Sequence, residues 1–266
     1  MSCFEFALHE LSVLPILATF HPLEDAHLVL RRAQQAMSDD APDELLWTSF
    51  IRKGPPRPWM PPGLVGLPGV PSVIEWSGDP ERGMALLAGL RDELAPPAGS
   101  LDLVPFAEIQ TAGDQDFRAG LHSYVKATFG DELTDGLIDA LVERGRSLGS
   151  ELTQVELLAM GGAIRWVASD ATAFPYRDAA WLLNVPASWQ DPADSEREIA
   201  WVRDTFAAIA PFGSGGAYSN FLEGDEQAND QVAYGRTLRR LQAVKAVYDP
   251  DNIFRLNQNV TPVAAA

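Results

Sequence analysis

The sequence predicts an α+β fold: a mainly antiparallel sheet covered on one face by helices, with a C-terminal helix and a returning tail segment. Three observations support this fold class. Short apolar runs that are typical of strands alternate with longer segments of helical periodicity. Several predicted strands follow one another without a helix between them, which favours antiparallel pairing over a parallel, doubly wound sheet. The composition is globular, because 46% of the 266 residues are hydrophobic.

The N-terminal part of the chain is predicted to hold two strands and a helix. The segment FEFALHEL alternates apolar and polar residues from Phe4 to Leu8, and SVLPILATF follows as a continuous apolar run. In HPLEDAHLVLRRAQQAM, Pro22 stands where a first helical turn tolerates proline. Apolar residues of that segment share one helical face, so a helix is expected there: Leu23, Ala26, Leu30 and Ala33.

Two further strands and a second helix are predicted before residue 95. The segments ELLWTSFI and SVIEW are strand-like, whereas RKGPPRPWMPPGLVGLPGVP between them is too rich in proline and glycine to hold a ladder or a helix. We therefore expect a long surface connection there. GDPERGMALLAGLRDEL predicts a helix with Asp79 as its N-cap and Pro80 at its first position.

Elements after residue 100 repeat this pattern more loosely. LDLVPFAEIQ predicts a strand or a sheet edge, and TDGLIDALVERGRSL a helix capped by Thr134. ELTQVELLAMGGAIRWV is β-like but interrupted by two glycines, and AAWLLNVPASW predicts a strand. DSEREIAWVRDTFAAIA predicts an amphipathic helix with acidic residues at its start. A last helix is expected from about Asn229 to Val247, ending at the Asp249-Pro250 turn.

Composition and residue spacing exclude several classes of function. A formal net charge of −17 repels polyanions, so nucleic acid is not an expected partner. The single cysteine, Cys3, allows no intrachain disulfide, and the four histidines lack metal-ligand spacing, so no metal site is expected. The N-terminal segment has no basic n-region, and its apolar run is shorter than the ~20 residues of a membrane span. A cytoplasmic location without a membrane partner is therefore expected.

Polar residues are concentrated in two segments that flank the last predicted helix, GGAYSNF and YDPDNIFRLNQNVTP. Elsewhere the sequence has no Gly-x-Ser-x-Gly elbow, no Walker loop and no Gly-x-Gly-x-x-Gly between a strand and a helix. The glycine-rich GSGG at residues 213–216 follows a predicted helix, and we interpret it as a turn rather than a phosphate loop. The two flanking segments are therefore the strongest functional signal.

The C-terminal segment resembles the signature of the berberine bridge enzyme-like flavoprotein oxidases, which have the vanillyl-alcohol-oxidase fold. That signature runs lysine, Tyr-Asp-Pro, Asn, Phe-Arg and Asn-Gln. This chain has matching residues at that spacing: Lys245, Tyr248, Asp249, Pro250, Asn252, Phe254, Arg255, Asn257, Gln258, Asn259 and Pro262. HPLEDA, FPYRDAAWLLNV, ASWQDPAD and GGAYSNF are similar to the family's substrate domain, so the resemblance covers essentially the whole chain. One departure is Thr261, where the family usually has a proline.

The resemblance implies two regions: a substrate-binding-type α+β domain at residues 1–212 and a berberine-bridge-enzyme-like segment at residues 213–266. Family members are longer, and their N-terminal half carries the FAD-binding domain, with a pyrophosphate-cradling loop and a histidine linked to the flavin. The resemblance begins at the segment that follows that half, so the FAD-binding domain is expected to be absent here, and Cys3 is not carried over as the flavin-linked cysteine. The chain alone is expected to bind FAD weakly or not at all.

Roles are expected for five residues, of which the resemblance implies that of Tyr218. Tyr218 is similar to a tyrosine that lies over the flavin ring and assists proton removal, and Arg165 is a candidate substrate-binding residue that would place a cation near it on a strand. Asn220 shares a face with Tyr218 if the segment is a strand, and would orient the substrate. Asn257 and Asn259 share a face if the tail is extended, and their amides suit a flavin's ring edge or ribityl hydroxyls. Structural alternatives are a Tyr218 packed at a sheet edge and two asparagines that tie the tail to the domain.

Three functions follow from this interpretation. The first is the substrate-domain half of an FAD-dependent oxidoreductase that transfers a hydride from an alcohol, sugar or secondary-metabolite substrate to the flavin, with oxygen as acceptor. The second is a subunit that docks on a separate FAD-binding partner, which predicts an exposed apolar face. The third is a flavin-free binding or interaction protein that has kept the fold.

Overall fold

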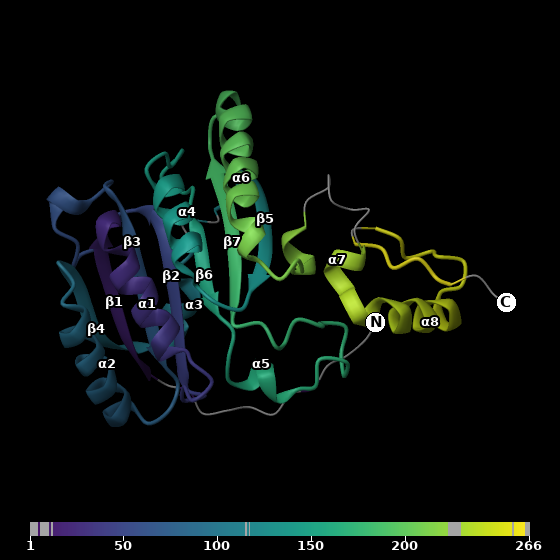
Figure 1. Ribbon diagram of the computed structural model, residues 1–266, viewed down its shortest axis with the longest axis horizontal. Helices are drawn as coiled ribbons and strands as arrows, with labels where there is room; N and C mark the ends of the chain where they lie inside the picture. Colours follow the sequence, from purple (N-terminus) through teal and green to yellow (C-terminus); the bar gives the residue numbers. More distant parts are fainter. Residues whose placement is uncertain are drawn as a thin grey trace.

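The computed structural model describes residues 13–114, 116, 118–222, 230–256 and 258–263, together with Glu5 and Leu11. Within these residues, seven strands form one sheet with the order β4-β1-β3-β2-β6-β7-β5 (Figure 1). All the pairs are antiparallel, which confirms the predicted fold class. The strands are β1 (Val13–Pro22), β2 (Leu45–Lys53), β3 (Pro68–Trp76), β4 (Ala98–Pro105), β5 (His122–Gly130), β6 (Val155–Ala159) and β7 (Trp181–Trp189).

Helices cover one face of this sheet (Figure 1). They are α1 (Ala26–Ala36), α2 (Pro80–Leu94), α4 (Asp135–Gly145) and α6 (Ser195–Ile209). Their apolar stripes pack on alternate strand residues, among them Trp47, Ile74 and Leu183, to form the main core. Because side chains alternate along a strand, the intervening residues point away from these helices. We call that second side the open face; it carries residues such as Phe50, Glu156 and the pair Leu182 and Asn184.

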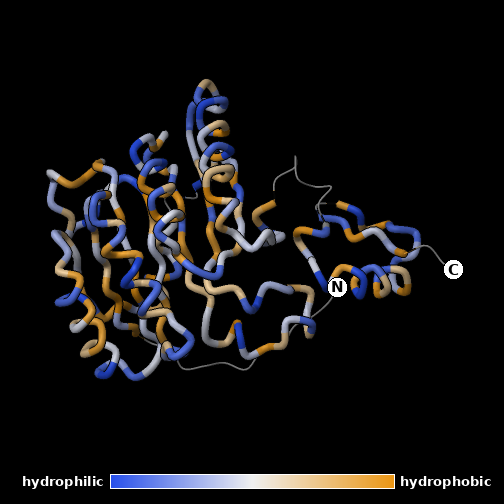
Figure 2. Tube along the Cα trace, viewed as in Figure 1, coloured by the Kyte–Doolittle hydropathy of each residue, from blue (hydrophilic) through white to orange (hydrophobic). Residues whose placement is uncertain are grey.

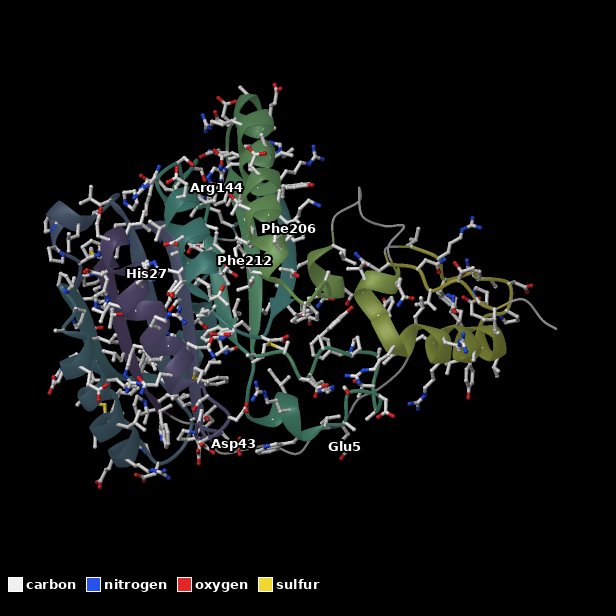
Figure 3. All side chains as sticks on the ribbon, viewed as in Figure 1. Glu5, His27, Asp43, Arg144, Phe206 and Phe212 are labelled. Carbon is white, nitrogen blue, oxygen red and sulfur yellow. The ribbon has the colours of Figure 1, made fainter. Side chains whose placement is uncertain are left out.

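Local sequence signals explain where the helices begin. The Asp79 side chain accepts the backbone N–H of Arg82 at 2.9 Å, and the hydroxyl of Thr134 accepts that of Leu137 at 3.3 Å. Both predicted N-caps are therefore confirmed. Between two of the covering helices, the guanidinium of Arg144, labelled in Figure 3, donates to Thr205 Oγ1 at 3.0 Å and so joins α4 to α6.

The proline-rich connection differs from the prediction at both of its ends. Strand β2 continues to Lys53, and β3 already begins at Pro68, so part of the segment does hold a ladder. The ladder is nevertheless interrupted at Pro71. The paired residues of β2 and β3 pass from Ser49↔Ser72 directly to Arg52↔Gly69. A proline nitrogen carries no hydrogen to donate, which accounts for this gap.

Other departures from the prediction lie at the sheet edge and near the C-terminus. The sequence indicated no strand at β5, and the segment expected as one edge strand after residue 100 becomes β4 followed by α3 (Phe106–Thr111). The last predicted helix is divided into α7 (Asp230–Tyr234), a 3-10 turn at Gly235–Thr237 and α8 (Leu238–Tyr248). Gly235 has a φ of 42°, which an α-helix does not tolerate. The predicted strand FEFALHEL lies outside the described residues apart from Glu5 and Leu11.

The C-terminal part, from α7 onward, lies beside the sheet and projects away from it (Figure 1). Hydrogen bonds attach it to the loop between β6 and β7: Tyr176 donates to the carbonyl of Val232, and Thr237 Oγ1 donates to that of Ala173 at 3.0 Å. Arg236 adds an ion pair with Asp178 at 2.8 Å. Polar contacts along one loop therefore hold this part in place.

Apolar side chains are unusually exposed along α8 and the tail. Figure 2 shows hydrophobic and hydrophilic residues alternating there. The exposed fraction reaches 84% for Tyr248 and 86% for Leu256. We call this surface the C-terminal apolar face, and its residues are Val247, Tyr248, Ile253, Phe254 and Leu256. Large exposed apolar patches mark interaction sites, so these exposed side chains are candidates for one.

Candidate functional site

Two adjoining cavities lie on the open face of the sheet. The first, of about 390 Å³, has Glu156 among its lining residues, and we call it the carboxylate cavity. The second, of about 340 Å³, includes Tyr218, and we call it the tyrosine cavity. Leu158 lines the first and packs against the aromatic cluster around the second, so the two are neighbours along β6.

Tyr218 is held by aromatic contacts and by one hydrogen bond. Its ring meets Phe174 and Phe221 edge to face, with centroid distances of 5.9 and 5.2 Å. The amide nitrogen of Asn220 donates to its phenol oxygen at 3.0 Å. The two predicted residues are therefore brought together, although not by strand alternation, because Ser219–Phe221 forms a 3-10 turn. With one lone pair of the oxygen occupied, the phenol hydrogen can point to a different acceptor.

Arg165 is not on a strand, which corrects the sequence prediction. Gly162, with a φ of 51°, turns the chain after β6, and Arg165 lies in the short helix α5 (Ala163–Trp166). Its guanidinium forms an ion pair with Asp39 at 2.9 Å. Among the described residues that line the tyrosine cavity, the cation is instead Arg177. A substrate-binding role for Arg165 stays a prediction.

Arg177 is a residue that the sequence reasoning missed. Its guanidinium carbon lies 5.5 Å from the centroid of the Phe174 ring, a cation–π distance. The same group donates to the carbonyl of Ile164 at 3.0 Å and to Thr172 Oγ1 at 2.9 Å. Its position in FPYRDAA, immediately before a predicted strand, was the available signal. The positive charge is thus fixed in the cavity that contains Tyr218.

Glu156 is the second residue that the sequence reasoning missed. It stands directly opposite Asn184 in the ladder between β6 and β7. Asn184 Nδ2 donates to one carboxylate oxygen at 2.8 Å, and Gln154 Nε2 donates to the other at 2.6 Å. Burial raises the pKa of the Glu156 carboxyl, and the two amide donors and the charge of Arg52 oppose that rise. The signal in the sequence was a glutamate between apolar residues of a strand.

Replacing Glu156 by glutamine is expected to change how stability depends on pH. A carboxyl whose pKa is raised on folding stabilises the protein most below its ordinary value of 4.5, and that contribution is lost as pH rises through the folded-state pKa. The glutamine side chain of the Glu156→Gln variant does not titrate. We therefore expect the variant to gain stability relative to the wild type as pH rises from 4.5, by up to about 1.4 kcal/mol per pH unit.

Urea unfolding of both proteins across this range measures the effect. Glu75, whose pKa is also raised by burial, is unchanged in the two proteins and cancels in the comparison. If the free energies of unfolding of the two proteins changed with pH in parallel, the pKa of Glu156 would not be raised on folding.

Asp249 organises the turn between α8 and the tail. Its carboxylate accepts the backbone N–H groups of Ile253 at 2.8 Å and Phe254 at 3.0 Å, and Lys245 Nζ lies 2.7 Å away. The hydrogen bond from Lys245 is the main reason why the pKa of Asp249 is lowered. The predicted turn role is confirmed, and it returns the tail alongside α8.

Asp249→Asn is expected to loosen the start of the tail. The variant loses the ion pair with Lys245, and an amide nitrogen replaces one of the two acceptors for the backbone of Ile253 and Phe254. Hydrogen exchange of those two amides should become several-fold faster at neutral pH. Because the pKa is lowered on folding, the wild type should lose the same protection only as pH falls below 3.8. Asp251→Asn, in the same turn, is the matched control, and equal exchange in both variants would refute the assignment.

The structure places one of the two predicted cofactor-binding asparagines. Asn257 lies outside the described residues, whereas Asn259 is partly buried and its Oδ1 has no hydrogen-bond partner among the described residues. The neighbouring Gln258 donates to the carbonyl of Leu222 at 3.1 Å, which brings this part of the tail beside the segment of Tyr218. An unpaired buried acceptor fits a group such as a flavin, whose ring N–H and ribityl hydroxyls are donors.

In the described part of the chain, no group of three or more His, Cys, Asp or Glu side chains is arranged to hold a metal ion. None of the helices described there is both long enough and apolar enough to cross a membrane.

Comparison with known proteins identifies the C-terminal segment. The family model described as berberine and berberine like matches residues 217–261, which include the Tyr218–Asn220 pair, the Asp249 turn and the tail. An FAD-linked oxidoreductase of Bacillus subtilis, YgaK, is 32% identical over 105 residues, or 40% of this chain and 23% of that protein. An FAD-linked oxidoreductase of Dictyostelium discoideum is 23% identical over 91% of this chain and 53% of its own length.

Solved structures of the same kind share the fold. A berberine bridge enzyme-like protein of Arabidopsis thaliana superimposes with a TM-score of 0.79 at 16% identity, covering 95% of this chain and 57% of the other. A glycopeptide hexose oxidase in complex with teicoplanin gives 0.74 at 25% identity, over 95% and 56% of the two chains. This chain therefore spans about half the length of such relatives. The chain is therefore similar to FAD-linked oxidoreductases and shares the fold of berberine bridge enzyme-like proteins, and its residues 217–261 match the family model described as berberine and berberine like.

Proposed function

We propose that the chain supplies the substrate-binding half of an FAD-dependent oxidase, in which a substrate C–H bond gives a hydride to the flavin and oxygen is the final acceptor. The observation that carries the proposal is Tyr218, whose phenol oxygen is held by Asn220 beside a cavity on the open face. Names of relatives support it, since they are FAD-linked oxidoreductases and a hexose oxidase. The substrate is a small alcohol, a sugar or a secondary metabolite.

The residues of this chain bind the substrate and move its proton. Tyr218 acts as the phenolate, after its own proton has passed to solvent: it takes the hydroxyl proton of the substrate and becomes a neutral phenol, while the neighbouring C–H bond gives up its hydride. Asn220 keeps the phenol oxygen in place, and Arg177 contributes a positive charge to the same cavity, which stabilises an anion formed there. The apolar walls of the cavity, which include Phe174 and Leu182, keep water away from the reacting atoms.

The flavin supplies the hydride acceptor, and this chain contributes polar groups that suit its ring. The side chain of Asn259 has an unpaired acceptor, and together with Asn257 it would bond the ring edge or the ribityl hydroxyls. The remaining contacts, above all those to the pyrophosphate, would come from an FAD-binding unit. The C-terminal apolar face is the surface that such a unit would cover, because it is exposed and adjoins the tail.

Purification of the tagged chain from its own host tests this proposal. We expect it to copurify with a flavin-containing protein, and the complex to consume oxygen and release hydrogen peroxide when offered a panel of alcohols and sugars. A double variant, Val247→Glu with Phe254→Glu, should abolish copurification because it places charges on the apolar face. The pair Val65→Glu and Leu67→Glu, exposed in the proline-rich connection, is the matched control. If the chain binds no flavin, either alone or in a complex with a partner, the proposal is wrong.

A further inference from the structure

Among the described residues that line the tyrosine cavity, Met160 is the one that contains sulfur. It directly follows β6, and its backbone N–H donates to the carbonyl of Ala180 at 2.8 Å, which extends the pairing of β6 with β7 by one residue. Because side chains alternate along a strand, Met160 shares the open face with Leu158. Its side chain is only 9% exposed, yet it lines the same cavity as Tyr218. The thioether therefore lies where the proposed reaction takes place.

Hydrogen peroxide is a product of that proposed reaction. Oxidation of a substrate in the tyrosine cavity and reduction of oxygen take place at the same flavin ring, so the peroxide is released next to the cavity. Peroxide is hardly larger than water, and the cavity of about 340 Å³ admits it. A methionine sulfur is oxidised by peroxide, whereas the aromatic and aliphatic side chains that share this lining are not. Met160 is therefore the residue of the lining that the product can modify.

The lining also contains a hydrogen-bond donor that an oxidised methionine would use. The Nε atom of Arg177 is buried and has no hydrogen-bond partner among the described residues, although the other nitrogens of the guanidinium donate to Ile164 and Thr172. Native proteins leave few buried polar atoms in that state. A thioether is only a weak acceptor, whereas a sulfoxide carries a polar oxygen. Oxidation of Met160 thus supplies an acceptor to the cavity in which Arg177 has a free donor.

We propose that Met160 is a self-oxidation site, at which the peroxide made by the complex converts the thioether to a sulfoxide and thereby lowers turnover. The sulfur attacks one oxygen of hydrogen peroxide, an S–O bond forms as the O–O bond breaks, and the other oxygen leaves as water. The sulfur is oxidised by one electron pair, and the peroxide is reduced. The sulfoxide places a polar oxygen among apolar walls and engages Arg177, whose charge the reaction uses. This inference rests on the proposed function and adds a limit to it.

The flavin-free chain, treated with dilute hydrogen peroxide, gives the first test. Met60 is the matched internal control, because it is 6% exposed but packs in a separate cluster with Phe20 and Ala98. Peptide mass spectrometry should find an added oxygen on Met160 several-fold sooner than on Met60, since the cavity brings peroxide to a buried sulfur. Equal rates of oxidation at these two buried methionines would overturn the inference.

Turnover of the flavin-containing complex gives the second test. Met84, on α2 at the opposite face of the sheet, is more exposed than Met160, so added peroxide should oxidise Met84 first. Peroxide made during turnover should reverse this order when catalase is present, because catalase removes the peroxide that has left the cavity. If Met84 were still oxidised ahead of Met160 during turnover, the peroxide would not act at the cavity and the inference would be wrong.

The decay of the turnover rate connects the sulfoxide to activity. With catalase present, the rate should fall in step with the sulfoxide fraction at Met160, and methionine sulfoxide reductase with a thiol reductant should restore it. Met160→Leu keeps the apolar volume, so this variant should lose a smaller share of its own initial rate. Met60→Leu is the control and should decay like the wild type. Equal decay of Met160→Leu and the wild type would refute the effect of the sulfoxide on turnover.

These outcomes separate the inference from the proposed function. If the complex makes peroxide and Met160 stays a thioether, the proposed function holds and the inference is wrong. If the complex makes no peroxide, both are wrong, and the direct measurement of peroxide identifies the proposed function as the cause.

Discussion

Tyr218→Phe is expected to slow turnover of the flavin-containing complex by about 10²-fold or more, with little change in substrate affinity. The variant loses only the phenol oxygen, which Asn220 holds at 3.0 Å. The ring itself remains packed edge to face on Phe174 and Phe221, so the shape of the cavity is kept. A loss confined to kcat is the mark of a group that acts in the transition state rather than in binding.

Tyr176→Phe is the matched control for this substitution. Tyr176 belongs to the same aromatic cluster, but its hydroxyl donates to the carbonyl of Val232 and serves to attach α7. Its loss should lower thermal stability and leave kcat near the wild-type value. If Tyr218→Phe also turned over at the wild-type rate, the proton would have to leave through another group, and Tyr218 would be a packing residue.

Trp181→Ala should cause the largest loss of stability, about 3–5 kcal/mol of the free energy of unfolding. Trp181 is 1% exposed on the covered face, so its removal leaves a large cavity in the main core. Its ring nitrogen donates to Gln34 Oε1 at 2.9 Å, and the same oxygen accepts the backbone N–H of Leu133 at 2.8 Å. The substitution therefore also weakens the connection between β7, α1 and the start of α4.

Urea unfolding measures this loss, with Trp166→Ala as the comparison. Trp166 in α5 is 70% exposed, and its removal should change the free energy of unfolding by no more than about 0.5 kcal/mol. Trp181→Phe should fall between the two, because it keeps an aromatic ring but gives up the hydrogen bond. If the Trp181→Ala and Trp166→Ala variants lost similar free energies of unfolding, the prediction would be wrong. The core would then have repacked to fill the cavity left by the Trp181 ring.

Features set by neighbouring residues could be predicted from the sequence. The caps at Asp79 and Thr134 and the turn at Asp249 each depend on atoms within five positions, and all three were confirmed. Strand β5 was missed because its covered side carries polar residues such as Lys126, which obscure the alternation. The start of β3, residues 68–71, was missed because its partners in β1 and β2 are distant in the sequence, and the ladder between β2 and β3 tolerates Pro71 through a gap.

In the candidate site, too, contacts between residues close in the sequence could be predicted, and contacts between distant residues could not. A motif located Tyr218 and Asn220. A strand was assumed where the structure has a 3-10 turn, but the two side chains are still in contact because the residues are only two positions apart. Glu156 and Asn184 are 28 positions apart, and only the register between β6 and β7 places one against the other. No pattern in the sequence indicates which face of β6 the helices cover. Arg165 was misplaced because Gly162 ends the strand before it.

The C-terminal apolar face also governs how the protein behaves in solution. At neutral pH the net charge of −17 keeps copies apart and opposes contact between these faces. Added salt screens that repulsion within about 10 Å at 0.1 M, while the attraction between apolar side chains persists. Near the isoelectric point of about 4.5 the repulsion vanishes altogether. We therefore expect the solubility of the chain on its own to fall as the salt concentration rises and as the pH is lowered towards 4.5. A partner that covers Tyr248 and Leu256 should remove this dependence.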